Sequence, residues 1–433
     1  MKFESQPTEY GPIPRDWNLR KLNSLCTKKD GIQTGPFGSQ LHMRDYQDRG
    51  TPIITVEHIG GYRIRHTDLP LVSDDDKRRL NRYILQKDDI VFSRVGSVDR
   101  VSSVHEEETG WLLSGRCLRV RPDPHEINSV FLSYFFRLPA FKNHINRIAV
   151  GATMPSLNTH LLSNVEVIVP DRTEQDNIAE VLTTFDRLID LDSGMNEVLE
   201  SIARAIFKSW FIDFDPVHAK AEGRMPFGMD EETVSLFPDS FEGSELGEIP
   251  KGWHVCKIGD VISLEYGKAL KKGSRIDGPI PVYGSNGQIG WHDEIITKGP
   301  GIVVGRKGNP GIVTWAPSSF YAIDTTFYVV PKEKIQSIHY LFFALKEKNL
   351  SDAAADSAVP GLNRNIAYNN ELLIPPKRIV DSFDSIVCSL FKMIHACERQ
   401  SQTLSSIRDA LLPKLLSGEI RISVSEEMEK VDA

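Results

Sequence analysis

The sequence predicts an α+β protein in which two mixed α/β modules are joined by two long antiparallel coiled-coil helices, within a pseudo-two-fold internal repeat. Three observations support this class. One motif occurs near the start of each half of the chain, and a second matched pair of motifs continues without a gap into a long stretch. Both of those stretches have the apolar spacing of a long helix.

The internal repeat begins with a motif that ends in tryptophan. Residues Glu9–Trp17 (EYGPIPRDW) return as Glu245–Trp253 (ELGEIPKGW), at an offset of 236 residues. Farther along, Pro155–Asn158 (PSLN) matches Pro360–Asn363 (PGLN) at an offset of 205, and this register continues into both long stretches. The second module is therefore 31 residues shorter between its shared ends. Shared ends around unlike middles indicate one scaffold that carries two different surfaces.

Each half then ends in a helical pattern. Apolar residues recur at steps of three and four from Ile178 to Ile206 and from Phe383 to Leu411, as in helices that pack along a seam. A helix of about 38 residues is roughly 57 Å long, so it cannot bury its apolar stripe inside one small module. We expect the two stripes to pack against each other, with the helices serving as a ruler between the modules. The alternative is that the two helices form an ordinary hairpin in a protein core, with no role in spacing two modules on DNA. The residues predicted for the seam or for partner binding are Phe185, Ile189, Leu199, Ile202, Ile206, Trp210, Leu390, Ile394, Leu404, Ile407 and Leu411.

These patterns divide the chain into six predicted segments. They are a first module at 1–170, a first central helix at 171–212, a linker at 213–244, a second module at 245–375, a second central helix at 376–417 and a C-terminal tail at 418–433.

The charge of the chain alternates along its length. The net charge is -8, but residues 1–150 hold 23 Lys and Arg against 19 Asp and Glu, and residues 251–350 hold 13 against 8. Residues 151–250 hold 6 against 20. Two weakly basic modules thus alternate with acidic segments, a pattern that permits DNA binding by the modules and disfavours it at the first helix.

Several function classes lack their signatures. The five cysteines form no CxxC pair, and no His pair has metal-ligand spacing, so neither a zinc site nor another metal site is expected. There is no phosphate-binding GxxxxGK[ST] loop, and no Asn-Pro-Pro-aromatic or Asp-Pro-Pro-aromatic quartet of an amino-methyltransferase. We expect no catalytic residues. The N-terminus has no apolar signal core and no segment is long and apolar enough to span a bilayer, so a cytoplasmic protein is expected.

Loops rich in glycine, cations and amides are the predicted DNA-binding elements. Arg can read guanine, Asn or Gln can read adenine, and Lys and Ser commonly hold phosphate, while glycine lets the backbone approach a ligand. The predicted DNA-binding residues of the first module are Gly35, Phe37, Gly38, Ser39, Gln40, Arg94, Ser97 and Arg100. Those of the second module are Lys268, Lys271, Lys272, Tyr283, Ser285, Asn286, Arg306, Lys307 and Asn309.

Six segments carry a resemblance to a known family. They are TGPFGSQL at 34–41, IFKSWFIDFDPVHAKAEG at 206–223, GEIPKGW at 247–253, VYGSNGQIG at 282–290, VGRKGNPG at 304–311 and LLPKLLSGEIRI at 411–422. On these segments the chain resembles the specificity subunit of type I restriction-modification enzymes, over nearly its whole length.

The resemblance implies a function for each part of the predicted fold. It implies two target recognition domains, each reading one half of a bipartite, asymmetric site in double-stranded DNA, and central helices that fix the spacer and bind two methyltransferase subunits. S-adenosylmethionine, and ATP with Mg²⁺, are then expected on the methyltransferase and restriction subunits, and no cofactor on this non-catalytic chain. Two alternatives stay open: an orphan scaffold without a DNA target of its own, and a self-contained methyltransferase or nuclease.

Overall fold

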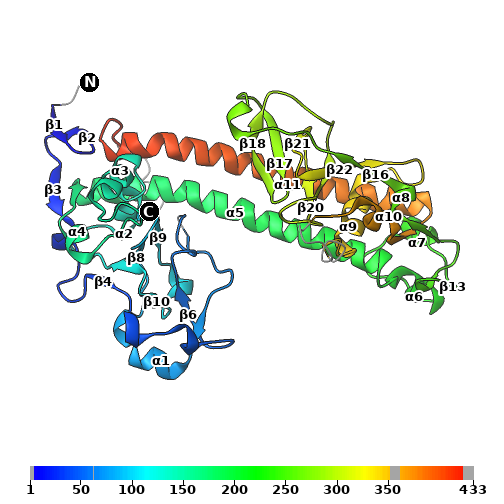
Figure 1. The fold of residues 1–433 in the computed structure, drawn as a ribbon, viewed down its shortest axis with the longest axis horizontal. Coiled ribbons are helices and arrows are strands. Elements are labelled where there is room, and N and C mark those ends of the chain that lie inside the picture. Colours follow the sequence, from blue (N-terminus) through cyan, green and yellow to red (C-terminus); the bar gives the residue numbers. More distant parts are fainter. Residues whose placement is uncertain (1–3, 62, 352–360, 423–433) are drawn as a thin grey trace, which may run out of the picture. The chain divides into compact units, whose positions relative to one another are not determined.

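The computed structural model describes residues 4–61, 63–351 and 361–422 (Figure 1). The chain forms two compact units. Unit 1 comprises Met1–Leu191 and Ser401–Ala433, and unit 2 comprises Asp192–Gln400. Each unit therefore contains one module together with half of each long helix. In the described part of the chain, no helix combines the length and apolarity that crossing a membrane requires.

Unit 1 is built on an antiparallel four-stranded sheet in the order β4-β11-β8-β9. Strands β8 and β11 are buried at every position, because both faces of these central strands are covered. A hairpin precedes this sheet, β3 pairs with β12, and a second four-stranded sheet follows the order β10-β6-β7-β5. The strands are β1 (Ser5–Thr8), β2 (Gly11–Pro14), β3 (Asn18–Lys21), β4 (Ile32–Thr34), β5 (Tyr46–Gln47), β6 (Thr51–Ile54), β7 (Leu71–Val72), β8 (Ile90–Ser93), β9 (Val101–Ser103), β10 (Leu112–Leu113), β11 (Cys117–Val120) and β12 (Glu166–Val169). The helices are η1 (Leu22–Leu25), η2 (Gly38–Gln40), η3 (Met43–Asp45), α1 (Asp74–Arg79), η4 (Asn81–Tyr83), η5 (Glu106–Glu108), α2 (Ser129–Phe135), α3 (Pro139–Ile148) and α4 (Thr159–Ser163).

Unit 2 has the same four-stranded sheet, hairpin and two-stranded pair as unit 1, but a different additional sheet. Its four-stranded antiparallel sheet has the order β16-β22-β19-β20, again with an N-terminal hairpin and a two-stranded β15-β23 pair. In place of the second sheet of unit 1, it has a three-stranded sheet in the order β18-β17-β21. The strands are β13 (Phe241–Ser244), β14 (Gly247–Pro250), β15 (His254–Lys257), β16 (Ile262–Tyr266), β17 (Ile280–Gly284), β18 (Gly287–His292), β19 (Gly301–Gly305), β20 (Val313–Ala316), β21 (Tyr321–Ala322), β22 (Thr326–Pro331) and β23 (Glu371–Ile374). The helices are α6 (Asp215–Ala221), α7 (Glu231–Ser235), α8 (Ile258–Val261), η6 (Lys272–Ser274), α9 (Ile338–Glu347) and α10 (Arg364–Asn369).

The helix that covers the sheet begins in the same way in both units. The side chain of Asn128 accepts a hydrogen bond from the Phe131 amide at the start of α2, and Ser337 accepts one from the Tyr340 amide at the start of α9. Such caps satisfy backbone donors that the first turn leaves unpaired. The repeat seen in the sequence is therefore also a repeat of strand order and of helix starts.

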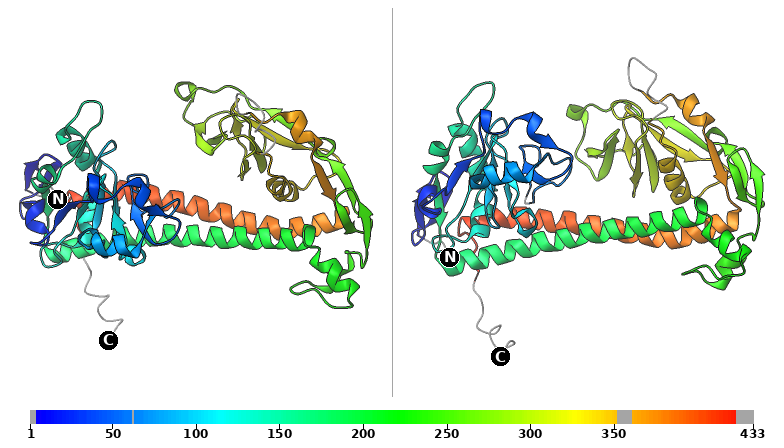
Figure 2. Two further views of the ribbon diagram at one scale, coloured as in Figure 1. Left: turned by 60° about the horizontal axis from the view of Figure 1, so that its bottom comes forward. Right: turned by 90° about the horizontal axis from the view of Figure 1, so that it is seen from below.

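The two long helices, α5 (Arg172–Phe211) and α11 (Lys377–Leu416), have 40 residues each. In unit 1 the first half of α5 shares a core with the second half of α11, and in unit 2 the second half of α5 shares a core with the first half of α11. Figure 2 shows the paired halves side by side. This arrangement confirms the antiparallel helix pair. The division between the two units falls within both helices, so each unit includes part of each predicted central helix.

The residues predicted for the seam or for partner binding differ in how far they are exposed. Leu199, Trp210 and Ile394 are buried, while Phe185, Ile189, Ile206, Leu390, Leu404 and Leu411 are partly buried. Ile202 and Ile407 are instead 43% and 42% exposed. Ala203, fully buried, continues the inward path four residues after Leu199, and a helix turns by about 100° per residue, so Ile202 points away from the seam.

The segment 213–244, which we predicted as a linker, is folded. It contains α6 and α7, and it contributes Val217 and Phe237 to the core of unit 2. Of the predicted tail at 418–433, only residues 418–422 are described.

A buried ionic cluster ties the helix pair to unit 1. Asp186 of α5, 4% exposed, accepts a hydrogen bond from the Tyr134 hydroxyl at 2.6 Å and pairs with Arg137 at 3.0 Å. Its other carboxylate oxygen pairs with Arg408 of α11. Because a buried carboxylate needs compensating partners, these residues fix the register of the two helices at this end.

Candidate nucleic-acid interface

One arginine occupies the same backbone position in both units. Arg94 follows β8, where its amide donates to the Arg116 carbonyl at 2.8 Å and its carbonyl accepts from the Leu157 amide at 2.9 Å. Arg306 follows β19, and its amide and carbonyl make the matching bonds to Thr325 at 2.9 Å and to Leu362 at 2.8 Å. The two arginines that the sequence placed in the DNA-binding loops are therefore structural counterparts.

The side chains of these arginines are held in the same way. The Nη1 of Arg94 donates to the Gly115 carbonyl at 3.1 Å, and its guanidinium lies over the Phe37 ring, 4.4 Å from the centroid. The Nη1 of Arg306 donates to the Asp324 carbonyl at 3.0 Å, and its guanidinium lies 4.9 Å from the centroid of Tyr266. Guanidinium–ring contacts of this kind are favourable by about 0.5–1 kcal/mol at exposed sites. Each unit thus holds a pre-positioned cation on an aromatic ring.

Both rings reach the surface. Phe37 is 47% exposed and Tyr266 is 48% exposed, and both arginines are partly exposed. Among the described residues, neither Arg94 nor Arg306 forms an ion pair with a carboxylate. A solvent-facing cation without a neutralising partner is suited to an anionic ligand.

Close backbone packing explains one glycine of the first motif. The amide of Gly35 donates to the Cys117 carbonyl at 3.2 Å, and a Cβ at this position would lie 2.1 Å from the Ser114 carbonyl oxygen. Gly267 has the same place in unit 2, where a Cβ would lie 2.0 Å from the Ile323 oxygen. Gly35 was predicted to contact DNA, but it is buried. Because it has no side chain, the end of strand β4 can pack closely against the backbone of Ser114. Gly38 is exposed, with a φ of +46°.

The other predicted residues of the first module differ in availability. The Gln40 side-chain oxygen accepts from the Tyr83 hydroxyl at 2.8 Å, so that oxygen is engaged within the protein. Ser97 and Arg100 are exposed, and the Nη1 of Arg100 lies 3.5 Å from the Val56 carbonyl. The side chain of Ser39 lies outside the described part of the structure.

The predicted residues of the second module gather on its loops, with one exception. Lys268, Lys271, Lys272, Asn286, Lys307 and Asn309 are exposed, and Ser285 is partly buried. The Asn309 side chain donates to the Asn286 side-chain oxygen and so joins the two amide-bearing loops. Tyr283 is only 5% exposed and packs edge-on against Phe320, and burial raises the pKa of its hydroxyl to about 12. This tyrosine supports the loop from within and is not presented to a ligand.

Sequence reasoning missed a second cation beside Tyr266. The guanidinium of Arg364 lies 5.2 Å from the Tyr266 centroid and 5.8 Å from that of Tyr368. Arg364 directly follows the repeated PGLN motif, which we interpreted as scaffold. Its position beside Tyr266 depends on the packing of α10 next to the end of β16.

Helix α5 has an exposed apolar stripe on the face away from the seam. Its members follow steps of three and four and are 37–63% exposed: Leu188, Leu191, Met195, Val198 and Ile202. In the 205-residue register the counterparts on α11 are Met393, Ala396, Gln400, Thr403 and Ile407, which form no continuous apolar stripe. Trp210, which we predicted for partner binding, lies 4% exposed in the core against Phe237.

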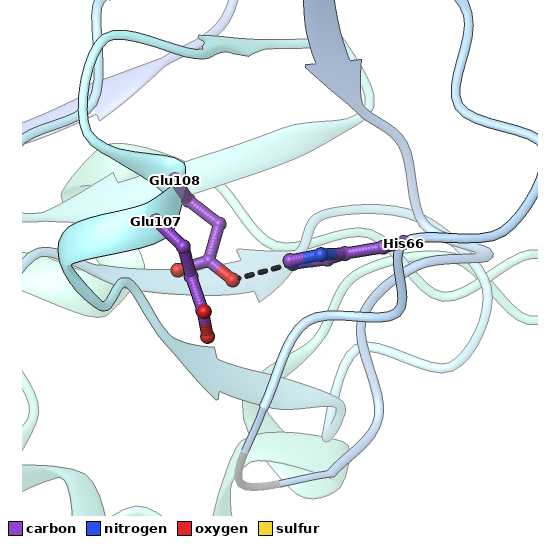
Figure 3. Close-up of side chains that lie close together, drawn as sticks. All are labelled: His66, Glu107 and Glu108. Atoms are coloured by element: carbon purple, nitrogen blue, oxygen red, sulfur yellow. Dashed lines mark hydrogen bonds and ion pairs between the residues drawn. The ribbon is translucent and has the colours of Figure 1, made fainter. Parts of the chain in front are cut away.

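Three side chains of unit 1 have the geometry of a possible cation site (Figure 3). The ligand atoms of His66, Glu107 and Glu108 lie within 4.8 Å of one another. His66 Nε2 lies 2.6 Å from an oxygen of the fully buried Glu108, and Arg63 lies 2.6 Å from an oxygen of Glu107. Both carboxylates therefore already have a nitrogen partner, and the cluster ties the loop of His66 to η5 without requiring a metal ion.

A comparison with known families matches both units. The family described as type I restriction modification DNA specificity domain matches residues 14–201 and 250–387. The chain belongs to this family. Each matched segment contains one module and part of one long helix, so the type I specificity domain occurs twice and the internal repeat follows from that duplication.

Similar proteins match this chain over most of their length. The MjaIX specificity subunit of Methanocaldococcus jannaschii, a type I restriction enzyme subunit, is 26% identical over 452 residues, covering 97% of each chain. The HindI specificity subunit of Haemophilus influenzae is 24% identical over 408 residues, covering 78% of this chain and 87% of that protein. A crystal structure of the S subunit from M. genitalium superposes with a TM-score of 0.54 at 18% identity, covering 94% of this chain and 97% of that one. This likeness confirms the predicted type I specificity fold.

Proposed function

We propose that this chain is the DNA-binding specificity subunit of a type I restriction-modification complex. The observation that supports this most directly is the pair of equivalent sites, Arg94 on Phe37 and Arg306 on Tyr266. Each site presents a guanidinium group on the surface of one family domain. Two such sites on one chain suit a ligand with two separated contact points, as a bipartite DNA site has.

The proposed target is asymmetric. The equivalent arginines stand in unlike surroundings, because unit 1 adds the sheet β10-β6-β7-β5 and unit 2 adds β18-β17-β21. Base readout depends on the side chains around the anchoring cation, so unlike surroundings favour unlike half-sites. We therefore expect a site whose two halves differ in sequence, and not a palindrome.

Partner subunits supply the chemistry in this proposal. The exposed α5 stripe is the proposed docking face for methyltransferase subunits, since it is apolar and lies in the acidic segment 151–250. S-adenosylmethionine is assigned to those two subunits, and ATP with Mg²⁺ to restriction subunits, while this chain has no catalytic role and acts in the cytoplasm.

Methylation-sensitive sequencing tests the proposal. The chain is co-expressed with its cognate methyltransferase subunits in a host without other methylation systems, and the host genome is sequenced. We expect one bipartite, asymmetric motif to be modified at nearly all of its occurrences. A complex that assembles but modifies no defined motif would instead support the orphan-scaffold alternative. Methylation by this chain without partners would overturn the non-catalytic assignment.

A further inference from the structure

Two arginine side chains of unit 2 share one exposed ring. Arg306 and Arg364 lie 4.9 Å and 5.2 Å from the centroid of Tyr266, which is 48% exposed. The two guanidinium carbons are therefore no more than about 10 Å apart, within roughly one Debye length at 0.1 M salt. The Arg306–Tyr266–Arg364 cluster is a local concentration of positive charge at the surface.

Contacts on each side hold the cluster in place. Arg306 is fixed by the bond from its Nη1 to the Asp324 carbonyl. Arg364 also lies over Tyr368, whose hydroxyl oxygen accepts a hydrogen bond from the Leu264 amide at 2.8 Å. The cations are thus ordered in advance of any ligand, which lowers the entropic cost of binding one.

In the part of the chain that the structure describes, no carboxylate pairs with these two cations. Within the described residues, neither Arg306 nor Arg364 forms an ion pair, although Glu265 and Asp324 are close to the cluster along the chain. Two guanidinium groups near one ring repel each other, and a bound anion offsets that repulsion. Phosphate is the anion that arginine binds with particular strength.

Unit 1 has only half of this cluster. Position 364 corresponds in the 205-residue register to Thr159, and both residues are the first of their helices, α10 and α4. Arg94 lies on Phe37 without a cation from that position. The second cation therefore distinguishes the two units at a place where their backbones match.

We propose that the Arg306–Tyr266–Arg364 cluster is a phosphodiester-binding site, which anchors unit 2 to the DNA backbone independently of base sequence. This inference rests on the proposed function. The Arg306 guanidinium is oriented by its bond to the Asp324 carbonyl and by the Tyr266 ring, and its other N–H donors remain available to an anion. A phosphate oxygen accepts single hydrogen bonds from several directions, and the two arginines of the cluster can donate such bonds.

The test uses Arg364→Ala in the full chain bound to its partner subunits. Affinity is measured for a cognate duplex and for a scrambled duplex over a series of NaCl concentrations. We expect both affinities to fall by a similar factor, about tenfold, and the slope of log K against log[salt] to become shallower by about 1. Arg364→Lys keeps the charge and should retain most of the slope. Arg224→Ala, which removes an exposed arginine paired with Glu222, is the matched control and should change neither quantity.

The outcomes separate this inference from the proposed function. Unchanged affinity and slope in Arg364→Ala, with specific binding by the wild type, would overturn the phosphate site and leave the function standing. A loss confined to one base pair of the cognate site would make Arg364 a base reader and overturn the phosphate role. If the wild type shows no sequence preference, the proposed function fails, while the slope on scrambled DNA still decides the phosphate site.

Discussion

Arg408 of α11 forms an ion pair with the buried Asp186 of α5, whereas their counterparts in unit 2, Ala203 and Phe391, both belong to an apolar core. The two ends of the helix pair are therefore held by different chemistry in the same register. This difference gives each half of a helix a preferred partner.

Arg408→Ala should destabilise the protein by about 3 kcal/mol, because Asp186 keeps its burial and loses one of its two cations. Urea unfolding of the full chain measures the change. Ala203→Arg is the matched test in unit 2, where the new cation would be buried against Phe391 without a carboxylate. If Ala203→Arg is neutral, the two ends of the helix pair are not chemically distinct.

Gly35→Ala and Gly38→Ala should differ in stability although the two positions are only three residues apart. A Cβ at Gly35 would lie 2.1 Å from a backbone oxygen, so strand β4 or the Ser114 loop must shift. At Gly38 nothing lies within 4 Å of an added Cβ, and the cost is the roughly 1 kcal/mol of a left-handed backbone. Equal losses in chemical denaturation would contradict the packing role of Gly35.

Arg94→Ala should remove the cation that positions the surrounding base-reading side chains of unit 1, and so weaken DNA binding by about 1–3 kcal/mol and relax selectivity in one half-site only. Unit 1 alone contains Arg94, so the half-site read by unit 2 should stay as selective as in the wild type. A binding screen on duplexes randomised in one half-site at a time measures this. Relaxed selectivity in both halves would show that the units do not read independently.

Ile202→Asp and Leu199→Asp should have opposite consequences on one helix. Ile202 is 43% exposed, so its replacement should leave unfolding unchanged within about 0.5 kcal/mol and weaken docking of the methyltransferase subunits. Leu199, 5% exposed, lies in the core, and a charge there should cost several kcal/mol. Size-exclusion chromatography of the reconstituted complex and thermal melting separate the two effects; normal assembly with Ile202→Asp would refute the α5 docking face.

The Asp384 carboxylate should make unit 2 sensitive to acid. Burial alone would raise its pKa, but hydrogen bonds from His339 at 2.7 Å and Ser337 at 2.6 Å outweigh burial and lower it below the ordinary value of 3.8. A depressed pKa stabilises the fold above the unfolded-state value, and this stability is lost as pH falls through the folded-state pKa. The difference in unfolding free energy between the wild type and Asp384→Asn should therefore be constant near neutral pH and shrink below about pH 4. Urea unfolding at a series of pH values measures this difference. A pH-independent difference would exclude the charge as its cause.

The repeat and the helices could be predicted because they follow from matched motifs and from apolar spacing. Residue type alone did not identify which apolar side chain faces the seam, so Ile202 was chosen where the smaller Ala203 fits. Tyr283 was assigned to DNA from its loop motif, yet the buried strand β17 places it in the core. Arg364 was not predicted as a DNA-binding residue, because its contact with Tyr266 joins residues that are far apart in the chain.

The shared frame has a genetic consequence. Strand orders β4-β11-β8-β9 and β16-β22-β19-β20 present an arginine at the same place, and repeated motifs border both modules. Recombination between related genes at those borders would exchange one reading module as a whole. Such an exchange leaves the helix contacts of the other unit intact, so under the proposed function a single event would create a new target that keeps one old half-site.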